Sequence, residues 1–537
     1  MDNSLKSAQV SITLYGGVGE VGGNIVYIHD TKPDSHILFD LGRSFRQQAK
    51  FYSWPNKPSR SVEVELIKTE ILPVIKTPAG NEIDCYATLQ LEEVLVPYGA
   101  KGKRVAVKRR TEIKYKIIEP QTKNLITDVF VSHSHSDHVG FVPLLREDIK
   151  ITLSRIARAF FQGFHEVVSK DSLETKLYLT EECLNARARE ELTPRHEYND
   201  FSVSQYGRAF KIPGTNTDLD VYAHPVDHSV PGADGYIAVT SAGPIVYTGD
   251  FRTHGKARIL TAKFVEAVKE FAPVKALICE GTNLGEAKVF SEDDVKKCAS
   301  DITKKSLQLG SQLVLVEVLQ ADIDRVRTFC EVARDHGFVP LVTLRLANYL
   351  HELGRIESQF NLAGAPLPLL GDHSSDQKRD YSLGIFVRRR HPAWRSKVFR
   401  KLEDTYGDFM IETTQIVKET KTGTRKYLII DTGEIDIIDL KPPPGTICIL
   451  STSEPFTEET EFDFERWKHQ LALFGIMLYH IHASGHVHPL ELLRVVKEIN
   501  PEMVIPIHTE YPDMFKEILA GTNIEVCIPK KGVPIEI

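Results

Sequence analysis

The sequence contains little cysteine, and no two cysteines are spaced as C-x-x-C. The seven lie far apart, at positions 85, 183, 279, 298, 330, 448 and 527. This spacing argues against a disulfide framework and a cysteine zinc site, and it predicts a cytoplasmic protein in a reducing environment. Residues 1–11 lack a basic and then apolar leader, and no run approaches the roughly 18 apolar residues that span a bilayer. We therefore expect neither secretion nor a membrane partner.

An excess of positive charge is also missing. The chain has 66 Lys and Arg against 73 Asp and Glu, which gives a net charge of -7. Overall charge therefore does not indicate a nucleic-acid-binding protein, and a polyanion would have to be bound by local patches or by metal ions. The 537 residues, 42% of them hydrophobic, suffice for one large domain or two to three medium domains with a sizeable core.

What the sequence does contain is a dense group of metal-ligand side chains. Segment 132–140 reads Ser-His-Ser-His-Ser-Asp-His-Val-Gly and follows an apolar run. A strand that turns sharply into a helix would direct His133 and His135 to one side and Asp137 and His138 to the other, so two adjacent ions could share the loop. Imidazole and carboxylate ligands without cysteine suit catalytic zinc. A solvated, His-rich loop is the alternative, although metal binding is the commoner reason for such clustering.

Further candidate ligands stand at or just past the ends of predicted strands. Asp40 ends a predicted buried strand at 36–39, where a carboxylate usually orients a ligating histidine, with a turn-forming role as the alternative. His228 and Asp250 also follow predicted strands and would complete a binuclear site.

Two more histidines, His486 and His508, follow the predicted strands 477–481 and 503–507. Loops at the carboxyl edge of a sheet are where α/β folds keep their chemistry. We therefore expect these histidines to lie near the other candidate ligands.

The N-terminal third contains two further features. The glycine-rich segment 16–24 is followed by a strand and not by a helix, so we interpret it as a tight loop beneath a bound group and not as a dinucleotide site. Segment 51–123 predicts hairpins laid on the main body. Its basic residues indicate either a phosphate-contacting flap or a solvated face; they are Lys101, Lys103, Arg104, Lys108, Arg109, Arg110, Lys114 and Lys116.

From residue 284 the pattern changes to β-α-β-α units, which predict a parallel sheet inserted between halves of another domain. The run Pro-Pro-Pro-Gly at 442–445 predicts the end of this insertion, and a strand at 446–450 is expected to return to the first domain. Within the insertion, Arg388 and Trp394 belong to a stretch that interleaves cations with an aromatic ring. Such a stretch is typical of base stacking and phosphate contact, and equally of an exposed helix start.

Together these motifs resemble a known superfamily. The order Asp40, His133-x-His135-x-Asp137-His138, His228 and Asp250 resembles the metallo-β-lactamase superfamily. Glu280, Ser484-Gly485-His486 and Pro506-Ile507-His508 resemble the three additional motifs of the β-CASP nucleases, and segment 16–24 with Ser484-Gly485-His486 is similar to ribonuclease J. A histidine at the last motif is the pattern of RNA-acting members. Glu280-Gly281-Thr282-Asn283, His508-Thr509-Glu510 and the segment 451–455 depart from ribonuclease J, which favours an archaeal-type or divergent member.

The resemblance implies an α/β fold: a metallo-β-lactamase αββα sandwich with an inserted β-CASP α/β domain built on a parallel sheet. Its expected parts are 1–283, the first part of the sandwich with the basic insertion at about 51–123; 284–444, the β-CASP domain; and 445–537, the C-terminal part with the last two motifs.

The resemblance also implies a site with two Zn²⁺ ions per chain, or Mn²⁺ in their place. One ion would be held by His133, His135 and His228, the other by Asp137, His138 and His508, with Asp250 bridging and Asp40 supporting from outside. The implied catalytic residues are Asp137, Glu280 and His486, with Glu280 orienting His486 toward the leaving oxygen or the scissile phosphate. The implied substrate contacts are Asn283, Ser484, Gly485, Arg388 and Trp394.

The function implied is a zinc-dependent ribonuclease that hydrolyses single-stranded RNA, as a 5′-to-3′ exonuclease. An endoribonuclease of the cleavage-and-polyadenylation type shares every motif and remains an alternative. A non-catalytic RNA-binding scaffold is disfavoured, because all seven ligand positions are filled. A homodimer is compatible with the resemblance.

Overall fold

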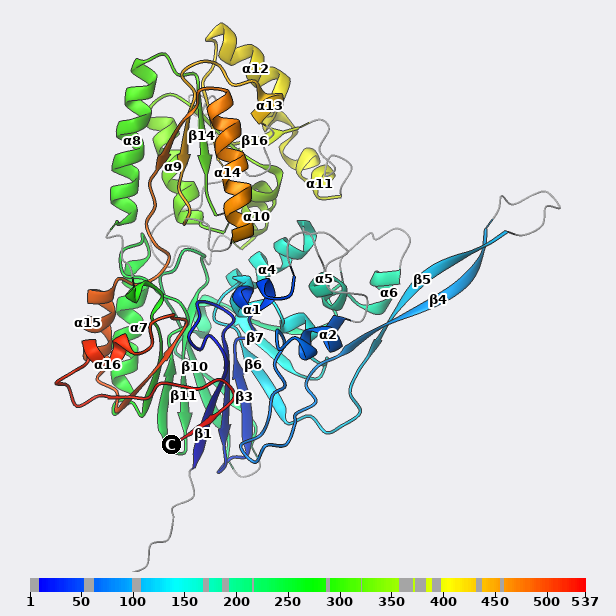
Figure 1. The fold of residues 1–537 in the computed structure, drawn as a ribbon, viewed down its shortest axis with the longest axis vertical. Helices are drawn as coiled ribbons and strands as arrows, with labels where there is room; N and C mark the ends of the chain where they lie inside the picture. Colours follow the sequence, from blue (N-terminus) through cyan, green and yellow to red (C-terminus); the bar gives the residue numbers. More distant parts are fainter. Residues whose placement is uncertain are drawn as a thin grey trace, which may run out of the picture.

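The computed structural model of the chain describes residues 9–52, 62–98, 108–167, 173–185, 193–214, 217–285, 290–319, 321–356, 370–371, 383–388, 397–430, 437–453 and 458–537. These residues form two lobes, one built on two sheets and the other on a third sheet (Figure 1). Within the described part, no helix combines the length and the apolar character needed to cross a membrane.

The larger lobe contains two seven-stranded sheets. The first has, in spatial order, the strands β23 (Pro534–Glu536), β1 (Val10–Gly16), β2 (Ile25–Asp30), β3 (Ser35–Phe39), β6 (Ile126–Phe130), β7 (Lys150–Ser154) and β8 (Tyr198–Phe201). The second has the strands β22 (Glu525–Val526), β21 (Met503–Ile507), β13 (Ala276–Glu280), β12 (Gly243–Tyr247), β11 (Asp234–Thr240), β10 (Leu219–Pro225) and β9 (Ala209–Ile212).

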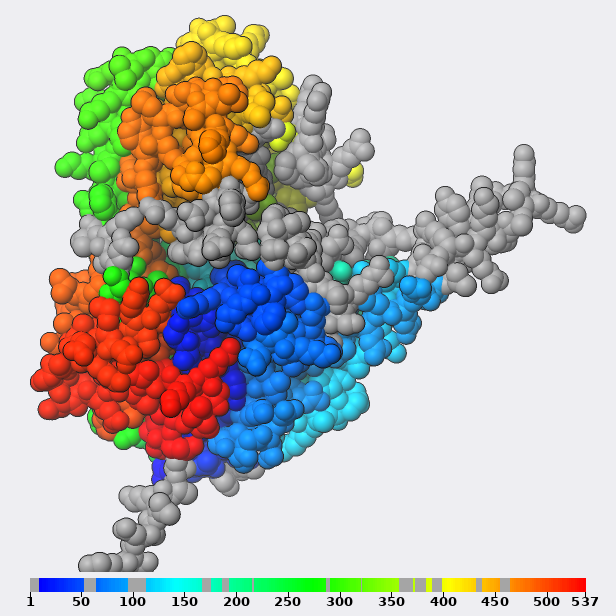
Figure 2. All heavy atoms as spheres, viewed as in Figure 1, coloured from blue at the N-terminus to red at the C-terminus, as the bar shows by residue number. Residues whose placement is uncertain are grey.

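One core lies between these two sheets. Phe39 of the first sheet stacks on Tyr236 and Tyr247 of the second, with ring centroids 5.5 and 5.4 Å apart. The C-terminal strand β23 pairs with β1, so the first and last described strands meet at one edge of the sheet, where red and blue atoms adjoin in Figure 2. Burial of alternate strand residues against the opposite sheet is what holds such a sandwich together.

Helices cover both outer faces of the sandwich. Helix α4 (Arg155–Val167) and α5 (Leu173–Tyr178) share an apolar cluster with the first sheet, and α7 (Arg258–Glu270) and α15 (Pro489–Ile499) share one with the second. The order helix, sheet, sheet, helix confirms the predicted αββα sandwich. The remaining helices of this lobe are short: α1 (Phe45–Ala49), α2 (Val62–Lys68), α3 (Ser136–Val139), η1 (Val142–Leu144), α6 (Glu181–Asn185), η2 (Val203–Gln205), η3 (Thr282–Leu284) and α16 (Met514–Ile518).

The smaller lobe is built on a parallel sheet, as predicted. All its strand pairs are parallel. Its strands, in spatial order, are β17 (Met410–Glu412), β16 (Gly384–Val387), β15 (Val339–Val342), β18 (Tyr427–Ile430), β14 (Leu313–Glu317), β19 (Ile447–Leu450) and β20 (Met477–His480). Helices α8 (Glu292–Gln308), α9 (Ile323–Asp335), α10 (Leu344–Gly354) and α11 (Lys397–Tyr406) pack on one face, and α12 (Thr413–Thr422), α13 (Ile437–Leu440) and α14 (Glu458–Leu473) on the other.

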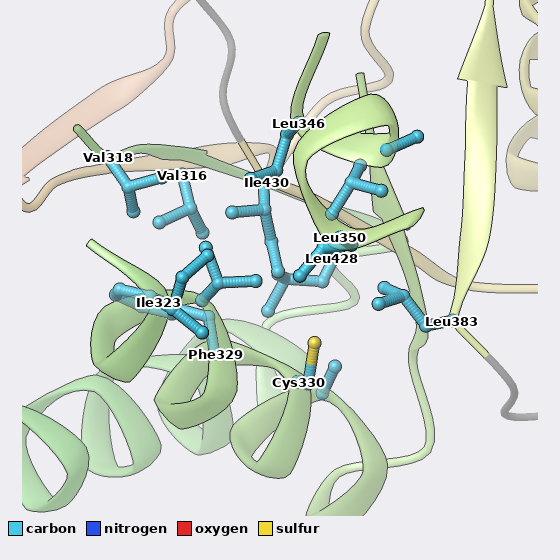
Figure 3. Packing of buried hydrophobic residues seen from close by; sticks show 14 of the residues in the cluster. Val316, Val318, Ile323, Phe329, Cys330, Leu346, Leu350, Leu383, Leu428 and Ile430 are labelled. Atoms are coloured by element: carbon cyan, nitrogen blue, oxygen red, sulfur yellow. The ribbon is translucent and has the colours of Figure 1, made fainter. Parts of the chain in front are cut away.

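The first of these faces carries a dense apolar core. Figure 3 shows Ile323 and Phe329 of α9 and Leu350 of α10 meeting Val316 and Leu428 of the sheet. Fully buried runs such as Leu-Val-Leu-Val in β14 are typical of a sheet covered on both faces.

The strand at 446–450 does not return to the sandwich, contrary to the prediction. It forms β19, which pairs in parallel with β14 and β20 of the third sheet. The chain therefore rejoins the sandwich after β20, and the inserted lobe ends near residue 480 and not at 444. The sequence misled because Ile-Cys-Ile-Leu is a fully buried run, and such a run does not say which sheet it joins.

The segment 51–123 also differs from the prediction of hairpins laid on the body. Its described residues contain helix α2 and a long antiparallel hairpin, β4 (Thr88–Tyr98) with β5 (Lys108–Ile118), which projects away from the lobe (Figure 1). Alternating Val and Glu in α2 suggested a strand, but burial of Leu66 in the outer core outweighs that local preference. Lys101, Lys103 and Arg104 lie outside the described residues.

Candidate metal centre

The candidate ligands come from the ends of strands in both sheets of the sandwich. The loop after β6 and helix α3 carries four of them, and the segments after β10, β12 and β21 carry the other three. Because the two sheets face each other, these edges meet. The structure thereby brings together all seven predicted ligands: His133, His135, Asp137, His138, His228, Asp250 and His508.

Three histidine nitrogens converge in the first group. His135 Nδ1 lies 3.1 Å from His133 Nε2 and 3.1 Å from His228 Nε2. His133 and His228 are buried, and His135 is partly buried. Three imidazole nitrogens that face one point are a common set of protein ligands for a catalytic zinc ion.

The second group lies beside the first. His508 Nε2 is 3.2 Å from Asp137 Oδ2, and His138 belongs to the same group. Asp250 Oδ2 lies between the two groups, 3.0 Å from His138 Nε2, 3.6 Å from His508 Nε2 and 3.7 Å from His133 Nε2. This carboxylate oxygen has the position expected of a bridging ligand.

The directions of the ring protons test whether these residues fit a metal. His228 Nδ1 lies 2.6 Å from the carbonyl oxygen of Gly485, and a carbonyl only accepts, so Nδ1 carries the proton and Nε2 presents a lone pair to the centre. His138 Nδ1 lies 2.7 Å from Asp40 Oδ2, so His138 Nε2 faces the centre, where Asp250 Oδ2 lies 3.0 Å away. Imidazole nitrogens and carboxylate oxygens gathered in a buried space are a donor set that suits a metal ion, so the residues fit a metal.

The electrostatics of the metal-free site agree with this fit at most ligands. His138 differs, because burial is outweighed by Asp250, Asp40 and Asp137, which raise its pKa well above the usual value, so a metal ion would have to displace its proton. Burial and neighbouring imidazoles lower the pKa of His133 and His228 well below the usual value, and burial lowers that of His135 to about 4. Burial raises the pKa of Asp250, but His138 and His508 outweigh it and hold that pKa well below the usual range. Neutral imidazoles and an ionised carboxylate are the protonation states that bind metal ions.

Asp40 supports the site from outside, where the sequence predicts a carboxylate that orients a histidine. Its Oδ1 accepts from the Ser132 N–H at 2.6 Å, and its Oδ2 accepts from His138 Nδ1, the Ser132 hydroxyl and the Tyr247 hydroxyl at 2.6 to 2.7 Å. Asp40 and His508 both have positive φ, 58° and 54°. Strained backbone of this kind persists only where the surroundings hold it, and it clusters at functional sites.

Thr282 was not singled out from the sequence. Its hydroxyl donates to Glu280 Oε2 at 2.7 Å and lies 2.8 Å from His508 Nδ1, so it links the carboxylate to a candidate ligand. His486 Nδ1 lies 3.3 Å from Glu280. Burial opposes a charge on His486, but Glu280 and Asp250 raise its pKa to about 9. The place of Thr282 two residues after Glu280 was the available signal in the sequence, but its link to His508 depends on the fold.

Three of the predicted substrate contacts, Asn283, Ser484 and Gly485, form hydrogen bonds within the protein. Asn283 Nδ2 donates to the His486 carbonyl at 2.9 Å and to Ser484 Oγ at 3.0 Å, so its amide hydrogens already brace the loop that carries His486. Ser484 Oγ accepts from the His486 N–H. The Gly485 carbonyl holds His228, as described above. These contacts hold the three residues in place beside His486 and His228, and their contact with substrate remains a prediction.

Arg388 does not join the cluster of candidate ligands in the part of the chain that the structure describes. Arg388 follows β16 in the smaller lobe, and its Nη2 lies 2.8 Å from Asp439 Oδ2. Trp394 lies outside the described residues. Contact of Arg388 and Trp394 with nucleic acid remains a prediction.

The glycine-rich loop lies directly against the candidate ligands. The His508 N–H donates to the Gly17 carbonyl at 2.8 Å, and the Asn24 N–H donates to the Asp137 carbonyl at 2.9 Å. Gly22 has φ of 84°, and a Cβ added there would lie 2.7 Å from Asp137 Oδ2. The loop thus binds the backbone of His508 and Asp137. A strand follows the loop, as the sequence indicates, so the loop is not a dinucleotide-binding turn.

A second histidine cluster lies on the β2–β3 hairpin. His29, Asp34 and His36 have donor atoms close together, and each histidine Nε2 is 3.6 Å from Asp34 Oδ1. The two rings are stacked nearly parallel, at 10°, so their in-plane lone pairs do not meet at one point. We assign no metal to this cluster.

Comparisons with known proteins agree with this geometry. Residues 122–286 match the Metallo-beta-lactamase superfamily. The chain is 23% identical over 408 residues to ribonuclease J of Mycoplasma genitalium, covering 74% of this chain and 60% of that protein. It is 20% identical over 550 residues to ribonuclease J of Helicobacter pylori, covering 99% of this chain and 60% of that protein. It is 21% identical over 428 residues to ribonuclease J of Methanocaldococcus jannaschii, covering 74% of this chain and 77% of that protein.

Among solved structures, a protein of unknown function from Enterococcus faecalis has the same fold, with a TM-score of 0.66 at 18% identity, and covers 99% of this chain and 100% of that one. The chain spans about 60% of the length of the bacterial relatives named above. Residues 122–286 of this chain are thus similar to the metallo-β-lactamase superfamily, and the chain as a whole is similar to proteins named ribonuclease J.

Proposed function

We propose that the chain is a metal-dependent ribonuclease that hydrolyses phosphodiester bonds of single-stranded RNA from the 5′ end. The observation that carries the proposal is the position of Asp250 Oδ2 between two groups of His and Asp ligands. The likeness to proteins named ribonuclease J supports RNA as the substrate.

The site would hold two Zn²⁺ ions, or Mn²⁺, one with His133, His135 and His228 and the other with Asp137, His138 and His508. Two such ions lower the pKa of a bound water toward about 7 and stabilise the oxygens of an in-line attack at phosphorus.

The protein's own groups would position the substrate and move one proton. Glu280 and Thr282 face His486 Nδ1, so this nitrogen donates to the carboxylate and Nε2 remains for proton transfer to the leaving oxygen. Thr282 at the same time holds His508 through Nδ1. One carboxylate thereby orients both the proposed proton donor and a proposed ligand.

The test uses single-stranded RNA labelled at its 5′ end, carrying a monophosphate or a triphosphate. We expect labelled mononucleotides to appear first, matched DNA to be cut far more slowly, and a 5′ hairpin to block attack, because a duplex is too wide for a site that takes single strands. The Asp137→Ala protein should be folded and inactive.

Three outcomes would contradict parts of this proposal. Early internal fragments from a circular RNA would indicate an endonuclease. RNA binding by the metal-loaded protein without any hydrolysis would indicate a scaffold. Metal analysis that finds one tightly bound ion per chain, where we expect about two, would contradict the bridged site.

A further inference from the structure

Two arginines lie fully buried where the lobes meet, and they share one carboxylate. Arg252 follows β12 of the sandwich, only two residues after Asp250, and Arg325 lies on α9 of the smaller lobe. Glu292, the first residue of α8, lies between them. All three side chains are at most 1% exposed.

The contacts of Glu292 reach both arginines. Its Oε1 accepts from Arg252 Nη1 at 3.2 Å and from Arg325 Nη2 at 2.8 Å, and its Oε2 accepts from Arg325 Nε at 3.2 Å. Burial raises the pKa of Glu292, but the two guanidinium groups outweigh it and lower that pKa to about 2, so the carboxylate is ionised.

The outer ends of this network approach the metal centre from two sides. Arg252 Nε donates to Asp227 Oδ1 at 3.1 Å, and Asp227 precedes the candidate ligand His228. Arg325 Nη2 donates to the carbonyl of Ala483 at 3.0 Å, in the loop that continues to Gly485. The two branches of the network meet at His228, because the Gly485 carbonyl accepts a hydrogen bond from His228 Nδ1 at 2.6 Å.

Stability alone does not explain such a network. Apolar side chains of similar volume often stabilise a protein as well as buried ion pairs do, whereas charge-assisted bonds to planar guanidinium groups impose a definite geometry. In this protein the geometry of the network affects the hydrogen bond between Gly485 and His228. Gly485 approaches His228 so closely that a Cβ would lie 3.2 Å from the imidazole Cε1, so a small shift of Ala483 or Asp227 alters the bond that orients His228.

We propose that Arg252, Glu292 and Arg325 are positioning residues for the metal ligand His228, so that correct docking of the smaller lobe is required for tight metal binding in the larger lobe. This proposal rests on the metal site of the proposed function and not on the RNA substrate. It assigns to the inserted lobe a role in building the site as well as any role in covering it.

The test compares two changes in the network with one change in a separate contact between the lobes. Glu292→Gln keeps the shape and removes the shared charge, and Arg325→Lys keeps the charge but cannot span the same acceptors. The control is Glu166→Gln. Glu166 on α4 also joins the lobes, by accepting from Asn348 Nδ2 of α10 at 3.1 Å, and none of its described contacts leads to His228.

Metal-free full-length proteins are titrated with Co²⁺, whose visible spectrum reports ligand geometry, and with Zn²⁺ in competition with a chelator. Both network variants should bind the ion at His228 on the order of tenfold more weakly, with an altered Co²⁺ spectrum. Glu166→Gln should lower the unfolding temperature and leave both metal readouts unchanged. If Glu292→Gln does not fold, Arg325→Lys decides alone.

Wild-type affinity and spectrum in a folded network variant would overturn the proposal. An equal loss in Glu166→Gln would also overturn it, because any loosening of the lobes would then suffice. A wild-type protein that binds metal as expected but leaves RNA intact would refute only the proposed ribonuclease.

Discussion

Replacing Asp40 with Asn tests how far the metal centre depends on a residue that is not itself a ligand. Asp40 is fully buried and accepts four hydrogen bonds, from the Ser132 N–H and hydroxyl, His138 Nδ1 and the Tyr247 hydroxyl. An Asn at this position has one accepting oxygen. If that oxygen takes the place of Oδ2, the new NH₂ group faces the Ser132 N–H, and neither donor has an acceptor there.

The magnitude follows from these contacts. One buried N–H without an acceptor costs about 1–3 kcal/mol of folding stability in the metal-free protein. His138 also loses its charged acceptor, and loss of such a partner weakens metal binding about 10- to 100-fold. At about 1.4 kcal/mol per factor of ten, that is about 1.4–2.8 kcal/mol of binding free energy.

The assay measures urea unfolding of the metal-free protein, metal affinity by chelator competition, and RNA hydrolysis at low and saturating metal. The matched control is Asp30→Asn. Asp30 is equally buried and accepts from the N–H and hydroxyl of Ser241, but it lies at the opposite end of β2 from the metal centre. Both variants should be destabilised, but only Asp40→Asn should need more metal for activity. Wild-type metal affinity in a folded Asp40→Asn protein would refute the reasoning.

Three shorter predictions concern other contacts. Gly485→Ala places a Cβ 2.8 Å from Ser229 Oγ, so it should push the carbonyl away from His228 and weaken metal affinity several-fold by chelator competition; unchanged affinity would contradict this. Thr282→Val should lower kcat for RNA about tenfold because the Glu280–His508 link is lost, whereas Thr282→Ser should retain most of it. Burial and Arg43 lower the pKa of His165 to about 3 from an unfolded value near 6.5, so its contribution to stability is complete above pH 6.5 and is lost as pH falls toward 3. Between pH 7.5 and pH 5, the free energy of unfolding measured in urea should therefore fall by about 2 kcal/mol less in His165→Gln than in the wild type. An equal fall in both proteins would contradict this prediction.

Local patterns predicted the elements that carry the site. The buried runs of β3, β6 and β21 and the polar residues that follow them are visible in the sequence, because strand pleating and ligand chemistry involve near neighbours. The β-α-β order of the smaller lobe is visible for the same reason, and all its strand pairs are parallel, as that order predicts.

Local patterns failed where a choice depended on distant partners. The residues of Ile447–Leu450 do not indicate that this strand pairs with β14 and not with a strand of the sandwich. The residues of α2 likewise do not indicate that Leu66 packs in the outer core. The internal partners of Asn283 and Gly485 could not be predicted for the same reason, because these partners lie elsewhere in the folded chain.

The sequence by itself thus determined the ligand types, their spacing and their places at strand ends, since these are properties of segments a few residues long. Only the tertiary structure decided which proton each histidine keeps, which group orients it and how the two lobes share buried charges. These depend on contacts such as that of His228 with Gly485, 257 residues apart, or of Asp40 with Tyr247, 207 apart. Such pairs meet only because burial of apolar strands brings distant segments together, and no local pattern encodes which segments those are.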